Sequence, residues 1–153
     1  MEGTQEIINL IKENKIYKAR KKIYELFKNN LKLFYYYIAL TYCAEGQYEF
    51  AVECFKLSIR NGLNSYIAYY NLGVSYIEIN ENKKAADCFV NCIRLKKDYL
   101  KSYLCLINLL NNLGENKNAY RVLKTATIYC ESQYVYAIEK KYYYEIIKMP
   151  GKL

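Results

Sequence analysis

Apolar residues recur along this chain at intervals of three and four positions, which is the spacing of amphipathic helices. In the middle of the sequence one such run covers residues 69–77, and a second covers residues 85–93. The polar segment 78–82 separates the two runs. This pattern predicts two amphipathic helices that are joined by a short turn.

The pattern of the middle segment recurs with a period of 34 residues. Residues 69–76 align with residues 35–42 and with residues 103–110. A residue that tolerates positive φ ends the first run of each unit: Gly46, Asn80 and Gly114 keep the same spacing, and Asn14 takes the matching place in the first unit. A period in this range indicates stacked supersecondary units, here pairs of antiparallel helices.

The repeat has a signature of individual residues. In residues 66–99 its positions hold, in order, Tyr69, Leu72, Gly73, Tyr76, Ala85, Phe89 and Cys92. Residues 32–65 and 100–133 follow in the same register. This signature resembles that of the tetratricopeptide repeat (TPR) family.

The resemblance implies an all-α fold, an α-solenoid of antiparallel helix hairpins with about nine helices. We expect a single array over residues 1–153, with a degenerate first repeat at 4–31 and full repeats at 32–65, 66–99 and 100–133. Residues 134–148 are expected to form a C-terminal capping helix. Lys140 and Lys141 stand there where the family has Leu and Gly, and a cap must present one polar face to water.

The composition fits a helical protein with a buried core. Hydrophobic residues make up 53% of the chain, including 20 Tyr. No apolar run approaches the length of about 18 residues that a membrane span needs. The first residues lack the basic and apolar segments of a signal peptide, so we expect a cytoplasmic protein.

The residues that catalysis commonly uses are scarce. The chain has no histidine, no Gly-rich phosphate loop and no Gly-x-Ser-x-Gly sequence. Six cysteines are present, without a Cys-x-x-Cys pair, and we interpret them as small buried apolar residues. We therefore expect neither an enzyme nor a bound metal or cofactor.

The candidate site follows from the resemblance, because in the TPR family the first helix of each hairpin lines a concave groove. Carried over to this sequence, the groove positions give a partner-binding site made of Tyr36, Tyr37, Leu40, Ile67, Tyr70, Asn71, Val74, Lys101, Cys105, Asn108 and Asn111. Such a lining is apolar and aromatic at one end and rich in amides at the other, which suits an extended or helical peptide. The alternative is that its apolar part packs against the chain's own first or last helix, or against a second copy.

The charge of the chain is +8, and it is uneven. Residues 1–32 carry eight Lys and Arg against four acids, a cluster that could contact an acidic protein, a membrane or nucleic acid, or could be a solvated outer face. The leading hypothesis is a protein–protein interaction module, an adaptor, scaffold or chaperone-like protein. The alternatives are a homodimer that associates through its tyrosine-rich groove or cap, and nucleic-acid binding by the basic first repeat.

Overall fold

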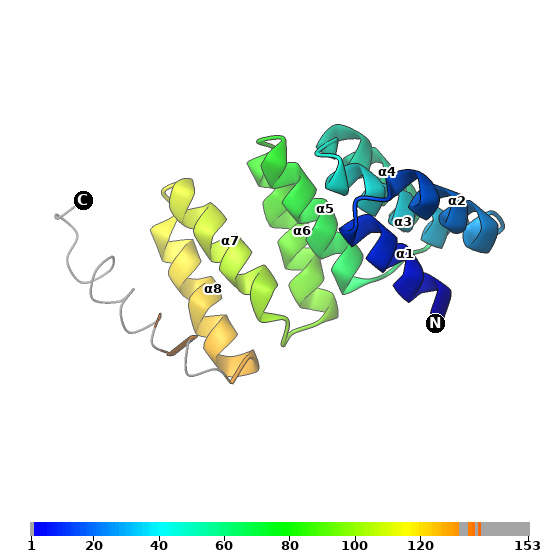
Figure 1. The fold of residues 1–153 in the computed structure, drawn as a ribbon. Helices are drawn as coiled ribbons and strands as arrows, with labels where there is room; N and C mark the ends of the chain where they lie inside the picture. Colours follow the sequence, from blue (N-terminus) through cyan, green and yellow to red (C-terminus); the bar gives the residue numbers. More distant parts are fainter. Residues whose placement is uncertain (1, 132–134, 137, 139–153) are drawn as a thin grey trace. The chain divides into compact units, whose positions relative to one another are not determined.

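The computed structural model describes residues 2–131, 135, 136 and 138. Within this part of the chain there are eight long α-helices and no strand (Figure 1). They are α1 (Glu2–Lys12), α2 (Ile16–Phe27), α3 (Leu31–Ala44), α4 (Tyr48–Arg60), α5 (Tyr66–Glu78), α6 (Asn82–Leu95), α7 (Leu100–Asn112) and α8 (Asn116–Tyr129). The expected all-helical fold is confirmed. The chain divides into two compact units, Met1–Ala85 and Ala86–Leu153.

In the first unit, α1 packs against α2, and α3 packs against α4. The helix α2 also contacts α3, and α4 contacts α5. The centre of this unit is apolar and well packed, because Ile23, Ala39 and Phe55 are fully buried. From α1 to α4, each helix therefore contacts the next one along the chain, as expected of a helical repeat.

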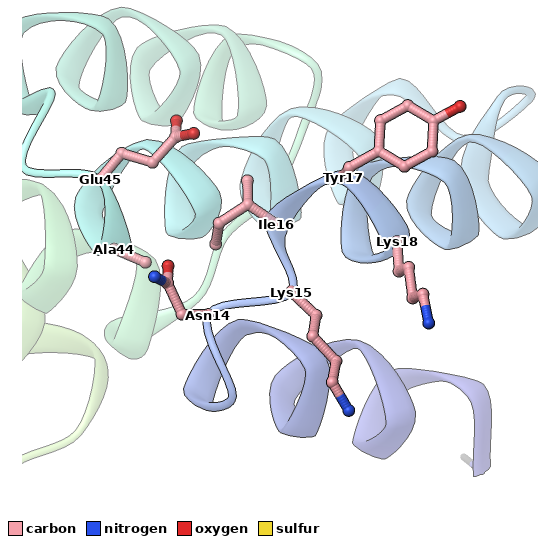
Figure 2. A pocket seen from close by; sticks show the side chains of 7 residues that line it. All are labelled: Asn14, Lys15, Ile16, Tyr17, Lys18, Ala44 and Glu45. Atoms are coloured by element: carbon pink, nitrogen blue, oxygen red, sulfur yellow. The ribbon is translucent and has the colours of Figure 1, made fainter.

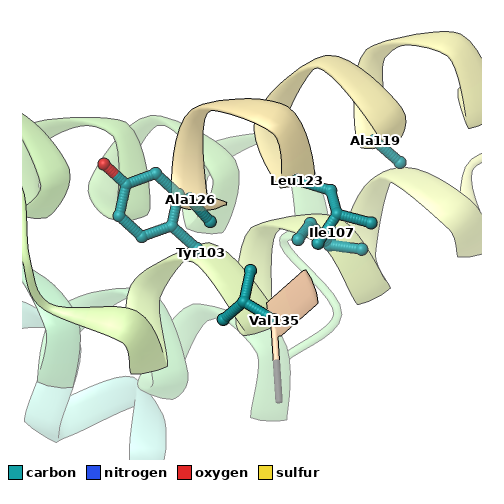
Figure 3. Close-up of a cluster of buried hydrophobic side chains, with 6 residues drawn as sticks. All are labelled: Tyr103, Ile107, Ala119, Leu123, Ala126 and Val135. Carbon is teal, nitrogen blue, oxygen red and sulfur yellow. The ribbon is translucent and has the colours of Figure 1, made fainter. Parts of the chain in front are cut away.

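In the second unit, α7 and α8 pack side by side around a cluster of buried side chains (Figure 3). Tyr103 and Ile107 come from α7, and Leu123 comes from α8. Val135 packs onto the same cluster, and with Tyr136 and Ile138 it is helical. Most of the predicted capping helix at 134–148 lies outside the described residues.

The second helix of each repeat shows the 34-residue period in its burial. Three sets of equivalent positions are fully buried: Ala51, Ala85 and Ala119; Phe55, Phe89 and Leu123; Ser58, Cys92 and Ala126. Small residues at the first position allow close helix packing, and large residues at the second fill the core. The burial of these three sets therefore follows the 34-residue period.

The turns between paired helices are built as the sequence predicts. Asn14, Gly46, Asn80 and Gly114 have φ values of 56°, 72°, 60° and 76°. Most residues with a Cβ are strained in this left-handed region of φ. Gly adopts it freely, and Asn adopts it at a smaller cost than most other residues. These four residues therefore set where α1, α3, α5 and α7 end.

Candidate functional site

Seven of the predicted site residues lie in the first unit, on α3 and α5, and all of them except Tyr37 lie on the sides of these helices away from the buried residues. The core side of α3 buries Ala39 and Thr41, whereas Tyr36 and Leu40 are half-buried. On α5 the core side is Ala68, Leu72, Gly73 and Ser75, and the predicted site residues are half-buried or exposed: Ile67, Tyr70, Asn71 and Val74. These six residues therefore lie outside the buried core of the repeats.

Two hydrogen bonds join α3 to α5 at this surface. The Asn71 side-chain amide Nδ2 donates to the Tyr36 hydroxyl at 3.3 Å. The Cys43 Sγ and the Ser75 Oγ are 3.5 Å apart, also within hydrogen-bonding distance. The ring of Tyr36 rests on Phe55 of α4, with 5.9 Å between the ring centroids. Tyr36 and Asn71 thus lie next to each other, and the Tyr36 ring packs on a fully buried residue.

Tyr37 faces the first hairpin instead. Its ring stacks on Phe27 at 5.1 Å with an interplanar angle of 4°, and its hydroxyl shares a hydrogen bond with Thr4. Burial raises the pKa of the Tyr37 hydroxyl, and the bond to Thr4 opposes this rise. For Tyr37, therefore, the alternative applies that part of the predicted site packs against the chain's own first hairpin. The repeat pattern did not predict this role of Phe27, because the equivalent residue in the next repeat is Asn61.

The other four predicted site residues lie on α7 in the second unit. Lys101 and Asn108 are exposed, and Cys105 and Asn111 are half-buried. They follow one another at helical spacing on one face, while the core side of α7 buries Ser102, Tyr103, Leu106, Ile107 and Leu109. This face offers a cation and amides where α3 offers aromatic rings.

Polar contacts of Arg20 join α2 to α3, and the repeat signature did not predict them. The Arg20 guanidinium donates to the Thr41 hydroxyl at 3.0 Å and to the Glu45 carboxylate at 2.6 Å. It also lies over the Tyr42 ring, 4.7 Å from the centroid. Arg20 belongs to the basic cluster of the first repeat, so part of that cluster holds helices together.

A shallow depression of about 670 Å³ lies between the α1–α2 turn and the end of α3 (Figure 2). It is lined by Asn14, Lys15, Ile16, Tyr17, Lys18, Ala44 and Glu45. None of the predicted site residues lines it. Lys15 pairs with Glu13 at 2.7 Å, which lowers the pKa of that carboxyl, so the cation nearest the turn is already neutralised.

The cysteines are free thiols, of which Cys88 and Cys92 are buried and four are half-buried. Burial raises the pKa of the Cys88 thiol to about 12 and also raises the pKa of Cys43. A protonated thiol is a poor nucleophile and a poor metal ligand. In the described part of the chain no group of three His, Cys, Asp or Glu residues is arranged to hold a metal ion.

Among the described helices, none is long and apolar enough to cross a membrane.

Comparison with known proteins relates this chain to others by structure. No family model and no curated protein matches the sequence. A crystal structure of MamA superimposes with a TM-score of 0.68 at 24% identity, over 83% of this chain and 74% of that one. A crystal structure of YrrB, described as a TPR protein with an unusual peptide-binding site, has a TM-score of 0.71 at 18% identity, over 90% of this chain and 73% of that one.

Yeast Tom70 is a third structural neighbour. Its TM-score is 0.66 at 17% identity, over 76% of this chain and 24% of that one. Identities this low relate folds and leave activities open. The neighbours and the residue signature agree, and the chain has the fold of the tetratricopeptide-repeat proteins.

Proposed function

We propose that this chain is a non-catalytic protein–protein interaction module, which binds a peptide or helix of a partner protein on the sides of α3 and α5 that lie away from their buried residues. The face of α7 provides a second contact surface of amides and one lysine. An adaptor, scaffold or chaperone-like role follows from such an activity.

The observation that carries the proposal is the character of the surface that the repeat packing leaves open on α3 and α5. Leu40, Ile67, Tyr70 and Val74 are half-buried or exposed apolar residues, and none of them belongs to the buried core. Tyrosine buries a large area at low conformational cost and keeps a hydroxyl for hydrogen bonding. Such surfaces are typical of sites that bind peptides.

The polar pair on this surface gives the proposal its chemistry. Tyr36 and Asn71 already lie within hydrogen-bonding distance of each other, and the Asn71 carbonyl oxygen Oδ1 is a further acceptor. A peptide backbone presents N–H and C=O groups that such a pair can bond. The structural neighbour YrrB, described as having a peptide-binding site, lends the proposal general support.

The test is a comparison of three baits in extracts of the native host. The wild-type chain is compared with Tyr70→Ala/Asn71→Ala and with a matched control, Tyr129→Ala/Asn118→Ala on α8, by quantitative mass spectrometry of the captured proteins. We expect the first variant to lose specific partners that the control retains. If both variants capture the same partners as the wild type, the α3–α5 surface is not the binding site.

A further inference from the structure

The outward face of α2 carries a row of exposed side chains that the repeat does not explain. Tyr17, Lys21, Tyr24 and Lys28 follow one another at spacings of four, three and four residues, which places them on one side of the helix. Tyr17 is 82% exposed and Tyr24 is 60% exposed. We call these four residues the tyrosine–lysine stripe. Figure 2 shows Tyr17 projecting from the first turn of α2.

Three acids lie near the lysines of this face: Glu6 and Glu25 line a depression together with Lys18 and Lys21, and the charge of Lys18 helps to lower the pKa of Glu13. Lys22 pairs with Glu6 and Arg20 with Glu45, so these two cations serve the packing of the first unit. Lys21 and Lys28, and Lys18 beside them, are exposed and form no ion pair within the described part of the chain. Glu25 is the single acid between Ile16 and Phe27. Lys21 and Lys28 therefore leave the stripe cationic, which favours an anionic partner.

We propose that the tyrosine–lysine stripe binds the surface of a bilayer that contains anionic phospholipids. Lysines near such a surface are attracted by its negative potential. Tyrosine favours the boundary between headgroups and acyl chains because its ring is apolar and its hydroxyl is polar. A row of Tyr and Lys along an exposed helix presents both features to a flat, fluid surface at once.

A protein partner fits the stripe less well. Tyrosine is enriched at protein interfaces, but lysine is depleted there, and the stripe alternates the two. A protein interface also places its aromatic anchors at the centre of a fully desolvated patch. Lys21 lies between the two tyrosines and would have to be desolvated together with them. A bilayer surface lets it keep its contact with water.

Nucleic acid fits less well for a different reason. Recognition of RNA uses polar side chains that bond base edges and hydroxyls, together with guanidinium groups that bond phosphates. The helix α2 contains no Asn, Gln, Ser or Thr. Its single guanidinium, Arg20, is already bonded to Thr41 and Glu45. The stripe thus lacks the groups that read a base sequence, and base stacking on Tyr17 and Tyr24 is the one means by which it could hold a single strand.

The test is co-sedimentation of the full chain with vesicles of phosphatidylcholine alone and of phosphatidylcholine mixed with phosphatidylserine. We expect binding to the mixed vesicles only, and binding that weakens as salt is added. Lys18→Gln/Lys21→Gln/Lys28→Gln should weaken it on the order of a hundredfold, because three attractions to the surface are lost. Equal binding to both vesicle types, or no binding, would overturn the proposal.

Two further variants separate the stripe from the overall charge. Lys83→Gln/Lys117→Gln/Arg121→Gln removes three exposed cations elsewhere, and we expect the binding to vesicles to remain nearly unchanged. Tyr17→Ser/Tyr24→Ser leaves the charge intact and should weaken binding several-fold. Equal losses from both lysine sets would show that only the net charge matters. A single-stranded oligouridylate that binds the stripe while the mixed vesicles do not would assign it to nucleic acid.

Discussion

The helices α3 and α7 stand at equivalent places two repeats apart, yet their faces away from the core differ. Where α3 has Tyr36 and Tyr37, α7 has Leu104 and Cys105, and Leu40 corresponds to Asn108. The α3 side chains contact α1, α2, α4 and α5, whereas Lys101 and Asn108 on α7 are exposed. The core positions of the two helices follow the same period. The comparison indicates that the repeat fixes the core side, while the other side is free to specialise.

The largest effect is expected from the residue beneath the α3 face. Phe55 is fully buried and supports the ring of Tyr36. Phe55→Ala should lower the free energy of unfolding by about 3–5 kcal/mol, because it leaves a cavity. Urea unfolding measures this loss. Phe50→Ala, at an exposed position of the same helix, should cost less than about 1 kcal/mol. Similar losses from both variants would contradict the assigned core.

A second effect is expected from Tyr103, a buried residue of α7 itself, and it depends on pH. Its hydroxyl donates to the Lys97 carbonyl oxygen at 2.9 Å, and burial raises its pKa from 10.0 to about 12. The folded state therefore holds this proton more tightly than the unfolded state does. The contribution to stability is complete below about pH 10 and is lost as pH rises through about 12.

The size of this loss is about 2–3 kcal/mol, since each pKa unit corresponds to 1.36 kcal/mol. This loss can be measured by urea unfolding of the wild type and of Tyr103→Phe between about pH 10 and pH 12. Other groups that titrate in this range, such as the Cys88 thiol, do so in both proteins, so the difference between the two unfolding free energies reports Tyr103 alone. The difference in unfolding free energy between the two proteins should shrink as pH rises. A difference that stays constant would contradict the shifted pKa.

A smaller effect is expected at the end of α3, where no equivalent exists on α7. Arg20→Ala removes hydrogen bonds to Thr41 and Glu45 and the contact with the Tyr42 ring. Because this cluster is partly exposed, the loss should be about 1–2 kcal/mol, measured by thermal unfolding. Arg20→Lys keeps the charge without the forked geometry, and its loss should be intermediate. If Arg20→Ala is as stable as the wild type, the contacts of Arg20 do not stabilise the fold.

The smallest effect concerns the polar pair on the α3–α5 surface. Tyr36→Phe removes the acceptor of the Asn71 amide and should cost about 0.5–1 kcal/mol. A double-mutant cycle with Asn71→Ala measures the coupling between the two side chains. No measurable coupling would mean that the two residues act separately at this surface.

The sequence predicts most of this fold because its strongest signals are local. Apolar spacing gives the helices, and the positive-φ residues Asn14, Gly46, Asn80 and Gly114 give the ends of α1, α3, α5 and α7. The period of 34 residues predicts which side chains are buried, as Ala51, Phe55 and Ser58 illustrate. These features depend on neighbours along the chain or at a fixed repeat distance.

The site is less predictable because its contacts break the period. Tyr37 and Tyr36 are adjacent in sequence and similar in chemistry, but one packs on Phe27 and the other bonds Asn71. Phe27 has no aromatic counterpart in the next repeat, so the period could not point to it. The Arg20–Glu45 pair joins residues whose charges look like ordinary surface charges in the sequence.

The most direct test of the central claim is the affinity of a peptide for the α3–α5 surface. Peptides are selected from a random library displayed on phage, and their dissociation constants are measured by calorimetry for the wild type, Tyr70→Ala/Asn71→Ala and Tyr129→Ala/Asn118→Ala. We expect Tyr70→Ala/Asn71→Ala to weaken binding by about tenfold or more, since the loss of a buried aromatic contact alone exceeds about 1.4 kcal/mol. Tyr129→Ala/Asn118→Ala should leave the affinity unchanged. Equal affinities for all three proteins would contradict the central claim.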